Sequence, residues 1–264
     1  MDRPRRHAGG FTLIELLAVI AILTLLLLML TPTLKKSKEL ARRAICACNL
    51  KSLAAAIILY STNNAGRIPL GYLGNSEFRQ GNYMVNQSSA HLSRPDMFFG
   101  CLVNDKLVPN PRLYYCPSSQ QPLFQFDTLV NPWLRISRPG ELNWTRFGYG
   151  TRPLAGWDAG TGWVRYGWPD RRVRDLPRYE MLEGRLAMAS DIVSTRDYVA
   201  SHHDEGVNFA STGGSVHWFW TKKFNALWQG TAGYGFYVGE YAPGFYDPGV
   251  SGGVWFDMDR HLGG

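Results

Sequence analysis

The chain has 264 residues, 45% of them hydrophobic and 19% charged, with a formal net charge of +7. This hydrophobic content excludes a wholly disordered chain, and the length allows one sizeable domain with its own core. The basic residues are scattered, with no run of five like charges. Such scatter favours a solvated basic surface and leaves nucleic acid as a weaker candidate partner.

The N-terminal segment joins a short basic head to a long apolar run. Three arginines precede twenty residues, Phe11 to Leu30, that carry one charge, Glu15. A helix of this length, at about 1.5 Å per residue, spans about 30 Å, the thickness of a bilayer core. The arginines predict a cytoplasmic N-terminus and export of the remainder of the chain. A carboxylate in lipid costs roughly 2.5–3.5 kcal/mol, so Glu15 is expected to have a partner.

A cleaved secretory signal peptide is the alternative interpretation of this segment. Its apolar core would span roughly 7–15 residues and would end at a small-residue cleavage site. Here the run is longer and continues into Thr31-Pro32-Thr33-Leu34 without an Ala-x-Ala site, which favours a membrane-spanning helix.

These residues resemble the N-terminus of the type IV pilin family, which includes the pseudopilins of type II secretion. The match is Gly10 followed by Phe11-Thr12-Leu13-Ile14-Glu15. The resemblance implies that a prepilin peptidase cleaves between Gly10 and Phe11 and methylates Phe11, so that residues 1–10 are a leader peptide. It also implies that Glu15 meets the terminal amine of a neighbouring subunit in a filament, and that Pro32 bends the helix.

The same resemblance implies a location and a set of partners. The precursor would be a single-pass protein of the inner membrane with a cytoplasmic N-terminus. Its C-terminal domain would lie in the periplasm, or outside the cell in a filament. The partners would be the prepilin peptidase, other pilin or pseudopilin subunits and the inner membrane.

Beyond Pro32 the apolar residues continue at helical spacing. The stripe is formed by Leu34, Ala41, Ile45, Cys48, Leu53, Ile57 and Tyr60. The asparagines and glycine within 61–66 suit a C-terminal cap. We therefore expect one long helix from Thr12 to Tyr60. Its transmembrane and assembly part would be residues 11–31, and its amphipathic continuation, 32–64, would carry the globular domain.

The four cysteines are Cys46, Cys48, Cys101 and Cys116. An exported domain permits disulfides, and we expect one that involves Cys116. Cys101 is its candidate partner through a modest loop, whereas Cys46 or Cys48 would instead fix the helix to the domain. Cys46 and Cys48 point to different sides of a helix and cannot easily bridge each other. Zinc is disfavoured because their C-x-C spacing differs from the usual C-x₂₋₄-C.

Residues 65–264 are predicted to form one β-rich domain. The segments 185–190, 206–210 and 214–220 have the composition of strands, and Thr212-Gly213-Gly214 joins the last two as a hairpin. Residues 72–96 and 140–180 are expected to be long surface loops. The expected fold class is α+β and pilin-like: one long N-terminal helix packed on a C-terminal antiparallel β-rich domain with long loops.

Part of this domain is similar to the terminal segment of the large pilin-like families of Planctomycetes, Verrucomicrobia and Lentisphaerae. The similarity rests on Cys116-Pro117-Ser118, Asp191, His202-His203-Asp204-Glu205-Gly206-Val207-Asn208 and Gly214-Ser215-Val216-His217-Trp218. Gly213 stands where those families usually carry an aspartate, so no role that needs this carboxylate is transferred. We expect a structural motif that includes Asp191, His202, Asn208 and Gly214, with hydrogen bonds to strand ends and to the turn.

The same residues allow other uses. The set Asp191, His202, His203, Asp204 and His217 could form a metal-dependent hydrolase site, but its spacing matches no known metal signature. Asp191, Asp204 and Glu205 could bind calcium, but the sequence does not fix their mutual geometry and so assigns no metal to them. Tryptophans in glycine-rich loops could form an adhesive surface: Trp144, Trp157, Trp163 and Trp168.

No nucleophile elbow, P-loop, dinucleotide fingerprint or zinc-protease motif is present, so no enzyme, catalytic residue or cofactor is expected. The motif and its resemblance favour a structural subunit of a type IV pilus or type II secretion pseudopilus. The large, loop-rich domain favours a minor subunit. The alternatives are a membrane-anchored surface binding or adhesion module and a periplasmic metal-dependent hydrolase.

Overall fold

The computed structural model describes residues 11–69, 84–89, 92–94, 99–133, 144–152, 156–158, 162–164, 178–181, 186–193, 196–203, 205–224 and 254–263. The chain divides into two compact units, Met1–Ala41 and Arg42–Gly264. The boundary lies inside the long N-terminal helix. The helix residues from Arg42 onward therefore belong to the same unit as the β-rich domain that the sequence places at 65–264.

The first element is one α-helix, α1 (Leu13–Asn63), which has 51 residues and confirms the predicted long helix. It ends as its polar residues predict. The amide of Gly66 donates a hydrogen bond to the carbonyl of Ser61 at 2.8 Å. Ala65 and Gly66 have φ of 54° and 77°, the left-handed conformation that closes many helices.

The buried face of α1 in the C-terminal unit is displaced from the predicted stripe over one turn. The last three residues of the stripe are buried as predicted, but Ile45 and Cys48 are exposed. Their neighbours Cys46 and Asn49 are buried instead. The hydrophobicity pattern did not predict this turn for two reasons. Asn49 is polar, and Cys46 is followed two residues later by a second cysteine, Cys48, which fits the pattern equally well.

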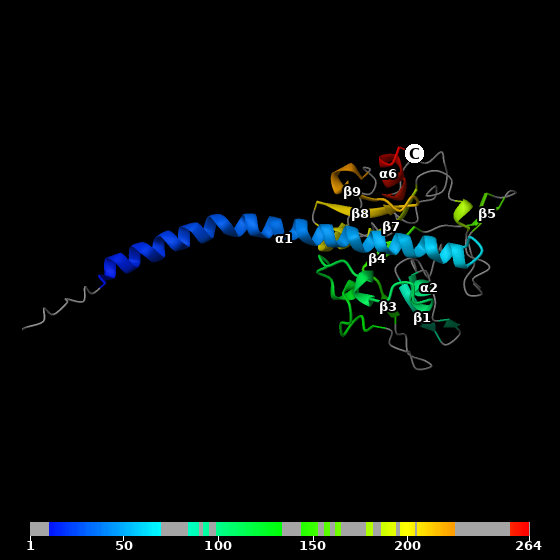
Figure 1. Ribbon diagram of the computed structural model, residues 1–264, viewed down its shortest axis with the longest axis horizontal. Coiled ribbons are helices and arrows are strands. Elements are labelled where there is room, and N and C mark those ends of the chain that lie inside the picture. The colour runs from blue at the N-terminus through cyan, green and yellow to red at the C-terminus, as the bar shows by residue number, and fades with distance from the viewer. Residues whose placement is uncertain are drawn as a thin grey trace, which may run out of the picture. The chain divides into compact units, whose positions relative to one another are not determined.

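A four-stranded antiparallel sheet, in the order β4-β7-β8-β9, lies at the centre of the C-terminal unit. Its strands are β4 (Tyr149–Thr151), β7 (Ala187–Asp191), β8 (Gly206–Ser211) and β9 (Val216–Trp220). The last three coincide with predicted strands. The turn from β8 to β9 contains Gly214 at φ 76°, which confirms the predicted hairpin (Figure 1).

The sheet separates two hydrophobic clusters. The cluster on the side of α1 includes Ile57 and Ala210. The cluster on the other side includes Phe209 and the residues Trp255 and Met258 of the C-terminal helix α6 (Val254–His261). Neighbouring residues of a strand point to opposite faces, which is why Phe209 and Ala210 separate in this way. β7 and β8 are buried along their whole length, so the end of β7 lies in the interior.

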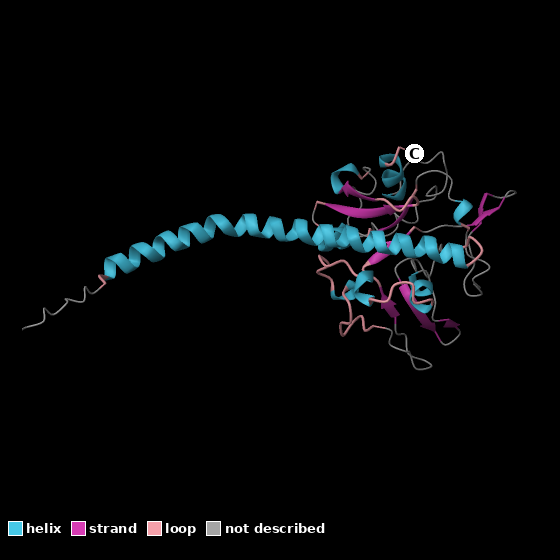
Figure 2. Ribbon diagram, in the orientation of Figure 1, coloured by secondary structure: helices cyan, strands magenta, loops and turns pink. Residues whose placement is uncertain are grey.

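Shorter elements surround this centre (Figure 2). β1 (Met84–Ser89), β2 (Leu92–Arg94) and β3 (Trp144–Arg146) form a second sheet, and β5 (Gly156–Asp158) pairs with β6 (Gly162–Val164). Parts of these segments were predicted as loops, because such short strands leave too little alternation to recognise. The helices α2 (Phe99–Asn104) and α3 (Arg196–His202) and four 3₁₀ turns complete the described elements: Pro111–Tyr114, Pro122–Phe124, Tyr179–Met181 and Thr221–Lys223.

Candidate functional site

The predicted processing and assembly residues lie at the start of α1, except for Gly10, which is outside the described residues. Phe11 precedes the helix and is 78% exposed. Thr12 and Glu15 form a capping box. Thr12 N and Oγ1 donate to Glu15 Oε2 at 2.8 and 2.7 Å, and the Glu15 amide donates to Thr12 Oγ1 at 3.3 Å. Within the single chain, the carboxylate therefore stabilises the first turn of its own helix.

The residues after Glu15 form an exposed apolar surface. Large hydrophobic side chains from Leu16 to Leu30 are 46–70% exposed. α1 contains an 18-residue window with a mean hydropathy of 3.0, none of it buried, so the helix is long and apolar enough to cross a membrane. A surface of this kind is stable in lipid or against other apolar helices.

Pro32 lies inside α1 and does not end it. Proline has no amide proton, so the helix loses one backbone hydrogen bond there. The two flanking threonines donate to nearby carbonyls, Thr31 Oγ1 to Leu27 O and Thr33 Oγ1 to Leu30 O, both at 2.7 Å. The hydroxyls are thereby satisfied in an apolar segment, and the bend expected at Pro32 stays a prediction.

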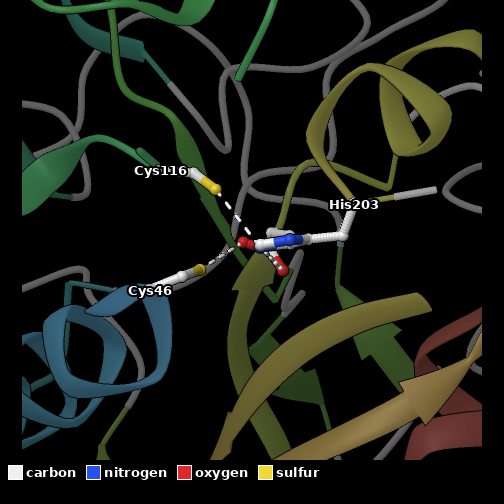
Figure 3. A group of neighbouring side chains, drawn as sticks. Cys46, Cys116 and His203 are labelled. Carbon is white, nitrogen blue, oxygen red and sulfur yellow. Dashed lines mark hydrogen bonds and ion pairs between the residues drawn. The ribbon is translucent and has the colours of Figure 1, made fainter. Parts of the chain in front are cut away.

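A second group of side chains lies in the interior of the C-terminal unit. Cys46, Cys116, Asp191 and His203 each offer one ligand atom, and these atoms lie within 4.8 Å of one another. We call this group the buried cluster. Its members come from α1, from the loop after the Pro111–Tyr114 turn, from the end of β7 and from the residue after α3. The three labelled side chains point toward one another in Figure 3.

Hydrogen bonds connect the members of the buried cluster. Cys46 Sγ donates to Asp191 Oδ1 at 2.9 Å, and Cys116 Sγ lies 3.4 Å from His203 Nε2. The same imidazole nitrogen is 3.7 Å from Asp191 Oδ2, which also accepts the backbone amide of Asn208 at 2.6 Å. All four members are at most 3% exposed. The cluster is therefore a polar site inside the core.

The two thiols differ in acidity. Burial raises the pKa of the Cys46 thiol well above its ordinary value, and Cys116 and Asp191 raise it further. Burial acts in the same direction on Cys116, but its contacts with Cys46 and His203 outweigh it and lower the pKa of that thiol. Cys46 is thus the hydrogen-bond donor to Asp191, and Cys116 is the thiol that ionises more readily.

Surrounding residues hold the two cysteines in place. A Cβ atom on Gly148 would lie 2.8 Å from the amide nitrogen of Cys116, so only glycine allows this close approach. Asn49 Nδ2 donates to the carbonyl of Tyr115 at 3.3 Å and to the Tyr149 hydroxyl at 3.4 Å. That hydroxyl donates in turn to Cys46 Sγ at 3.4 Å. These bonds connect α1 to the segment that carries Cys116.

The residues of the predicted C-terminal motif have separate positions. Asp191 and Asn208 meet through the hydrogen bond described above, and Gly214 lies in the β8–β9 turn. His202 is buried with its ring 5.9 Å from that of Phe124, and it is His203 that joins the buried cluster. The structural role expected of His202 stays a prediction, and the two adjacent histidines differ in position because neighbouring residues at a helix end point in different directions.

The structure does not contain the candidate Cys101–Cys116 disulfide, since none of the four cysteines forms a disulfide. Cys101 lies on α2 in the hydrophobic cluster, and Cys116 faces Cys46 and His203. The loop spacing that suggested the pair says nothing about which way each side chain points.

The three histidines of the hydrolase alternative are not brought together. His217 pairs with Ser215 Oγ at 2.8 Å and stacks on Phe209, and among the described residues neither His217 nor His202 belongs to a group of potential metal ligands. The calcium set is not placed, because Asp204 lies outside the described residues. Trp168 also lies outside them, while Trp157 and Trp163 are backbone partners in the β5–β6 pair.

Comparisons with known proteins each match a part of the chain. Residues 5–31 match the model of the prokaryotic N-terminal methylation motif. The chain is 33% identical over 69 residues to competence protein ComGC of Halalkalibacterium halodurans, which covers 26% of this chain and 67% of that protein. It is 33% identical over 60 residues to type II secretion system core protein G of Pseudomonas aeruginosa, covering 23% of this chain and 42% of that protein. No solved structure matches.

Proposed function

Because the chain belongs to the type IV pilin-like family, we propose that it is a structural subunit, of the minor type, of a type IV pilus or a type II secretion pseudopilus. The observation that supports this most is the methylation motif at residues 5–31, which coincides with the exposed apolar half of α1. The large C-terminal unit, most of which lies beyond these matches, favours the minor type.

The N-terminal segment also supports a processing route. We expect a prepilin peptidase to cleave between Gly10 and Phe11 and to methylate the new terminal residue. Before cleavage, residues 11–31 would hold the precursor in the inner membrane with its N-terminus in the cytoplasm. The C-terminal domain would lie in the periplasm until the subunit assembles with other pilins or pseudopilins.

Assembly would add a partner to Glu15 without removing its first one. Oε2 accepts both hydrogen bonds from Thr12, and Oε1 accepts none from the described residues. Cleavage creates a positive amine at Phe11, and the amine of a neighbouring subunit could bind Oε1. In an apolar surround such a charge pair is much stronger than at a surface, and it favours one register between subunits.

Mass spectrometry of the mature N-terminus tests the processing step in the full-length protein. We expect the wild-type chain to begin at methylated Phe11. Gly10→Val should leave the uncleaved precursor in the membrane, because the peptidase needs a small residue at the scissile bond. Gly9→Val is the matched control and should still be cleaved. A Gly10→Val chain that begins at Phe11 contradicts the assignment.

A further inference from the structure

The buried cluster is an unusual set of groups if hydrogen bonding is its only role. A carboxylate with 0% exposure is costly in a protein interior unless it is both paired and hydrogen-bonded. Two of the three cluster neighbours of Asp191 are thiols, which are weak donors and weak acceptors. Four separate segments of the chain nevertheless direct one electron-pair donor each to the same small volume.

We propose that Cys46, Cys116, Asp191 and His203 bind one divalent cation of the zinc type, which stabilises the C-terminal unit. The site would join α1 to β7 and to two loops. Cys116 and His203, which lie on these loops, are 87 residues apart in the sequence. It lies wholly within the C-terminal unit, so it does not depend on filament assembly.

The spacing of the four atoms suits a tetrahedral site. Zinc binds sulfur at about 2.3 Å and nitrogen or oxygen at about 2.0–2.2 Å, which separates neighbouring ligand atoms by roughly 3.3–3.8 Å. Three of the measured separations are 2.9 Å from Cys46 Sγ to Asp191 Oδ1, 3.4 Å from Cys116 Sγ to His203 Nε2 and 3.7 Å from that nitrogen to Asp191 Oδ2. Small side-chain adjustments would complete the tetrahedron.

The ligand types select the ion and its role. Thiolate and imidazole ligands favour zinc, whereas calcium and magnesium prefer oxygen ligands alone. Four protein ligands in a buried site leave no position for water or substrate, which is typical of a structural metal. On binding, the thiol protons pass to solvent. The Asn208 amide, 2.6 Å from Asp191 Oδ2, and the Tyr149 hydroxyl, 3.4 Å from Cys46 Sγ, would partly offset the negative charge of the ligands.

A disulfide between Cys46 and Cys116 is the competing use of the two sulfurs in an exported domain. It would require the sulfurs to approach to about 2.05 Å. It would also use only two of the four groups and would leave the convergence of Asp191 and His203 on the sulfurs unexplained. A metal uses all four groups, and for that reason we favour it.

The test uses the full-length chain purified in detergent, without a metal chelator. We expect one zinc per chain by elemental analysis. After removal of zinc, addition of Co²⁺ should give the intense visible bands of tetrahedral cobalt and a sulfur-to-cobalt charge-transfer band. Cys116→Ser and Asp191→Asn should each weaken zinc binding at least tenfold. Cys48→Ser, an exposed cysteine on the same helix, is the matched control and should bind zinc as the wild-type chain does.

Two results would overturn the proposal. One is a wild-type chain without metal whose peptides containing Cys46 and Cys116 are joined by a disulfide. The other is a wild-type chain that has free thiols and gives no sulfur-to-cobalt band when Co²⁺ is added. Both measurements are made on the wild-type protein, so the proposal is decided even if the ligand variants fail to fold.

Discussion

Glu15 has two roles, and substitution by alanine would remove both of them at once. It caps the first turn of α1 through Thr12, and we propose that it binds the terminal amine of a neighbouring subunit. A capping box needs only an acceptor at this position, and glutamine serves as well as glutamate. The intersubunit bond needs the negative charge. The two roles can therefore be separated by a change that removes the charge and keeps the acceptor.

We expect Glu15→Gln to be processed and inserted normally, because it keeps the cap and is no more polar in lipid. It should nevertheless reduce incorporation into filaments at least tenfold, as Glu15→Ala would. Thr12→Val is the reciprocal control, since it removes the hydroxyl of the capping box and keeps the charge. It should cost about 1 kcal/mol of helix stability and still assemble. Quantification of the variant in sheared filaments measures this. Normal incorporation of Glu15→Gln would contradict a charge-based role.

Sequence patterns identified Glu15 and Asp191 but did not decide which cysteine and which histidine would lie beside Asp191. Glu15 was evident because it is the one charge in an apolar run. Cys46 and His203 each lie near a residue of the same type, Cys48 and His202 respectively. The sequence pattern does not show which member of each pair belongs to the buried cluster. Which member of each pair faces the core depends on the rotation of α1 and on the path of the chain after α3. Tertiary packing sets both, so local sequence could not decide between them.

At the scale of elements, the long helix and the β8–β9 hairpin could be predicted because their signals are local. α1 has a long apolar run with a polar end, and the hairpin has two strand-like segments joined by glycines. β4 and α6 were missed. β4 has three residues and α6 has eight, and each is stabilised by its position against β7 rather than by its own sequence pattern.

The β8–β9 hairpin provides a test of close packing between strands. A Cβ atom on Gly206 would lie 2.4 Å from the carbonyl oxygen of Phe219 in the neighbouring strand. Gly206→Ala should therefore lower the free energy of unfolding by about 1–3 kcal/mol, because one backbone must move away from the other. In the turn, a Cβ atom on Gly213 would meet nothing closer than Ser211 Oγ at 3.7 Å. Gly213→Ala should change the stability by about 0.5 kcal/mol or less.

Urea denaturation of the full-length protein in detergent, followed by tryptophan fluorescence, measures both variants. Equal stabilities of the two variants would show that β8 and β9 do not approach as closely as the structure indicates at Gly206.

At the scale of the whole molecule, known relatives account for about a quarter of the chain, and the structure alone describes how the rest is held together. The end of the chain is part of this core. Asp259 of α6 accepts a hydrogen bond from the Ala187 amide at 2.7 Å and from Arg152 Nη1 at 2.9 Å. The same Arg152 nitrogen donates to the carbonyl of Ala187 at 3.2 Å. These bonds connect α6 to the edge and the centre of the main sheet.

The ion pair between Arg152 and Asp259 should therefore matter to the stability of the whole C-terminal unit. Its side chains are 5% and 9% exposed, and removal of one partner from a buried pair typically costs about 3–5 kcal/mol. Asp259→Asn keeps an acceptor for the Ala187 amide and removes only the charge, so we expect the free energy of unfolding to fall by an amount near the lower end, about 3 kcal/mol.

Glu180→Gln is the matched control. Its partner is Arg178, the side chains of this pair are 50% and 70% exposed, and exposed pairs contribute about 1 kcal/mol or less. Urea denaturation of the two full-length variants compares them directly. If Asp259→Asn were no more destabilising than Glu180→Gln, the charge of Asp259 would not be what holds α6 on the sheet, and its attachment would depend on the apolar contacts of Trp255 and Met258.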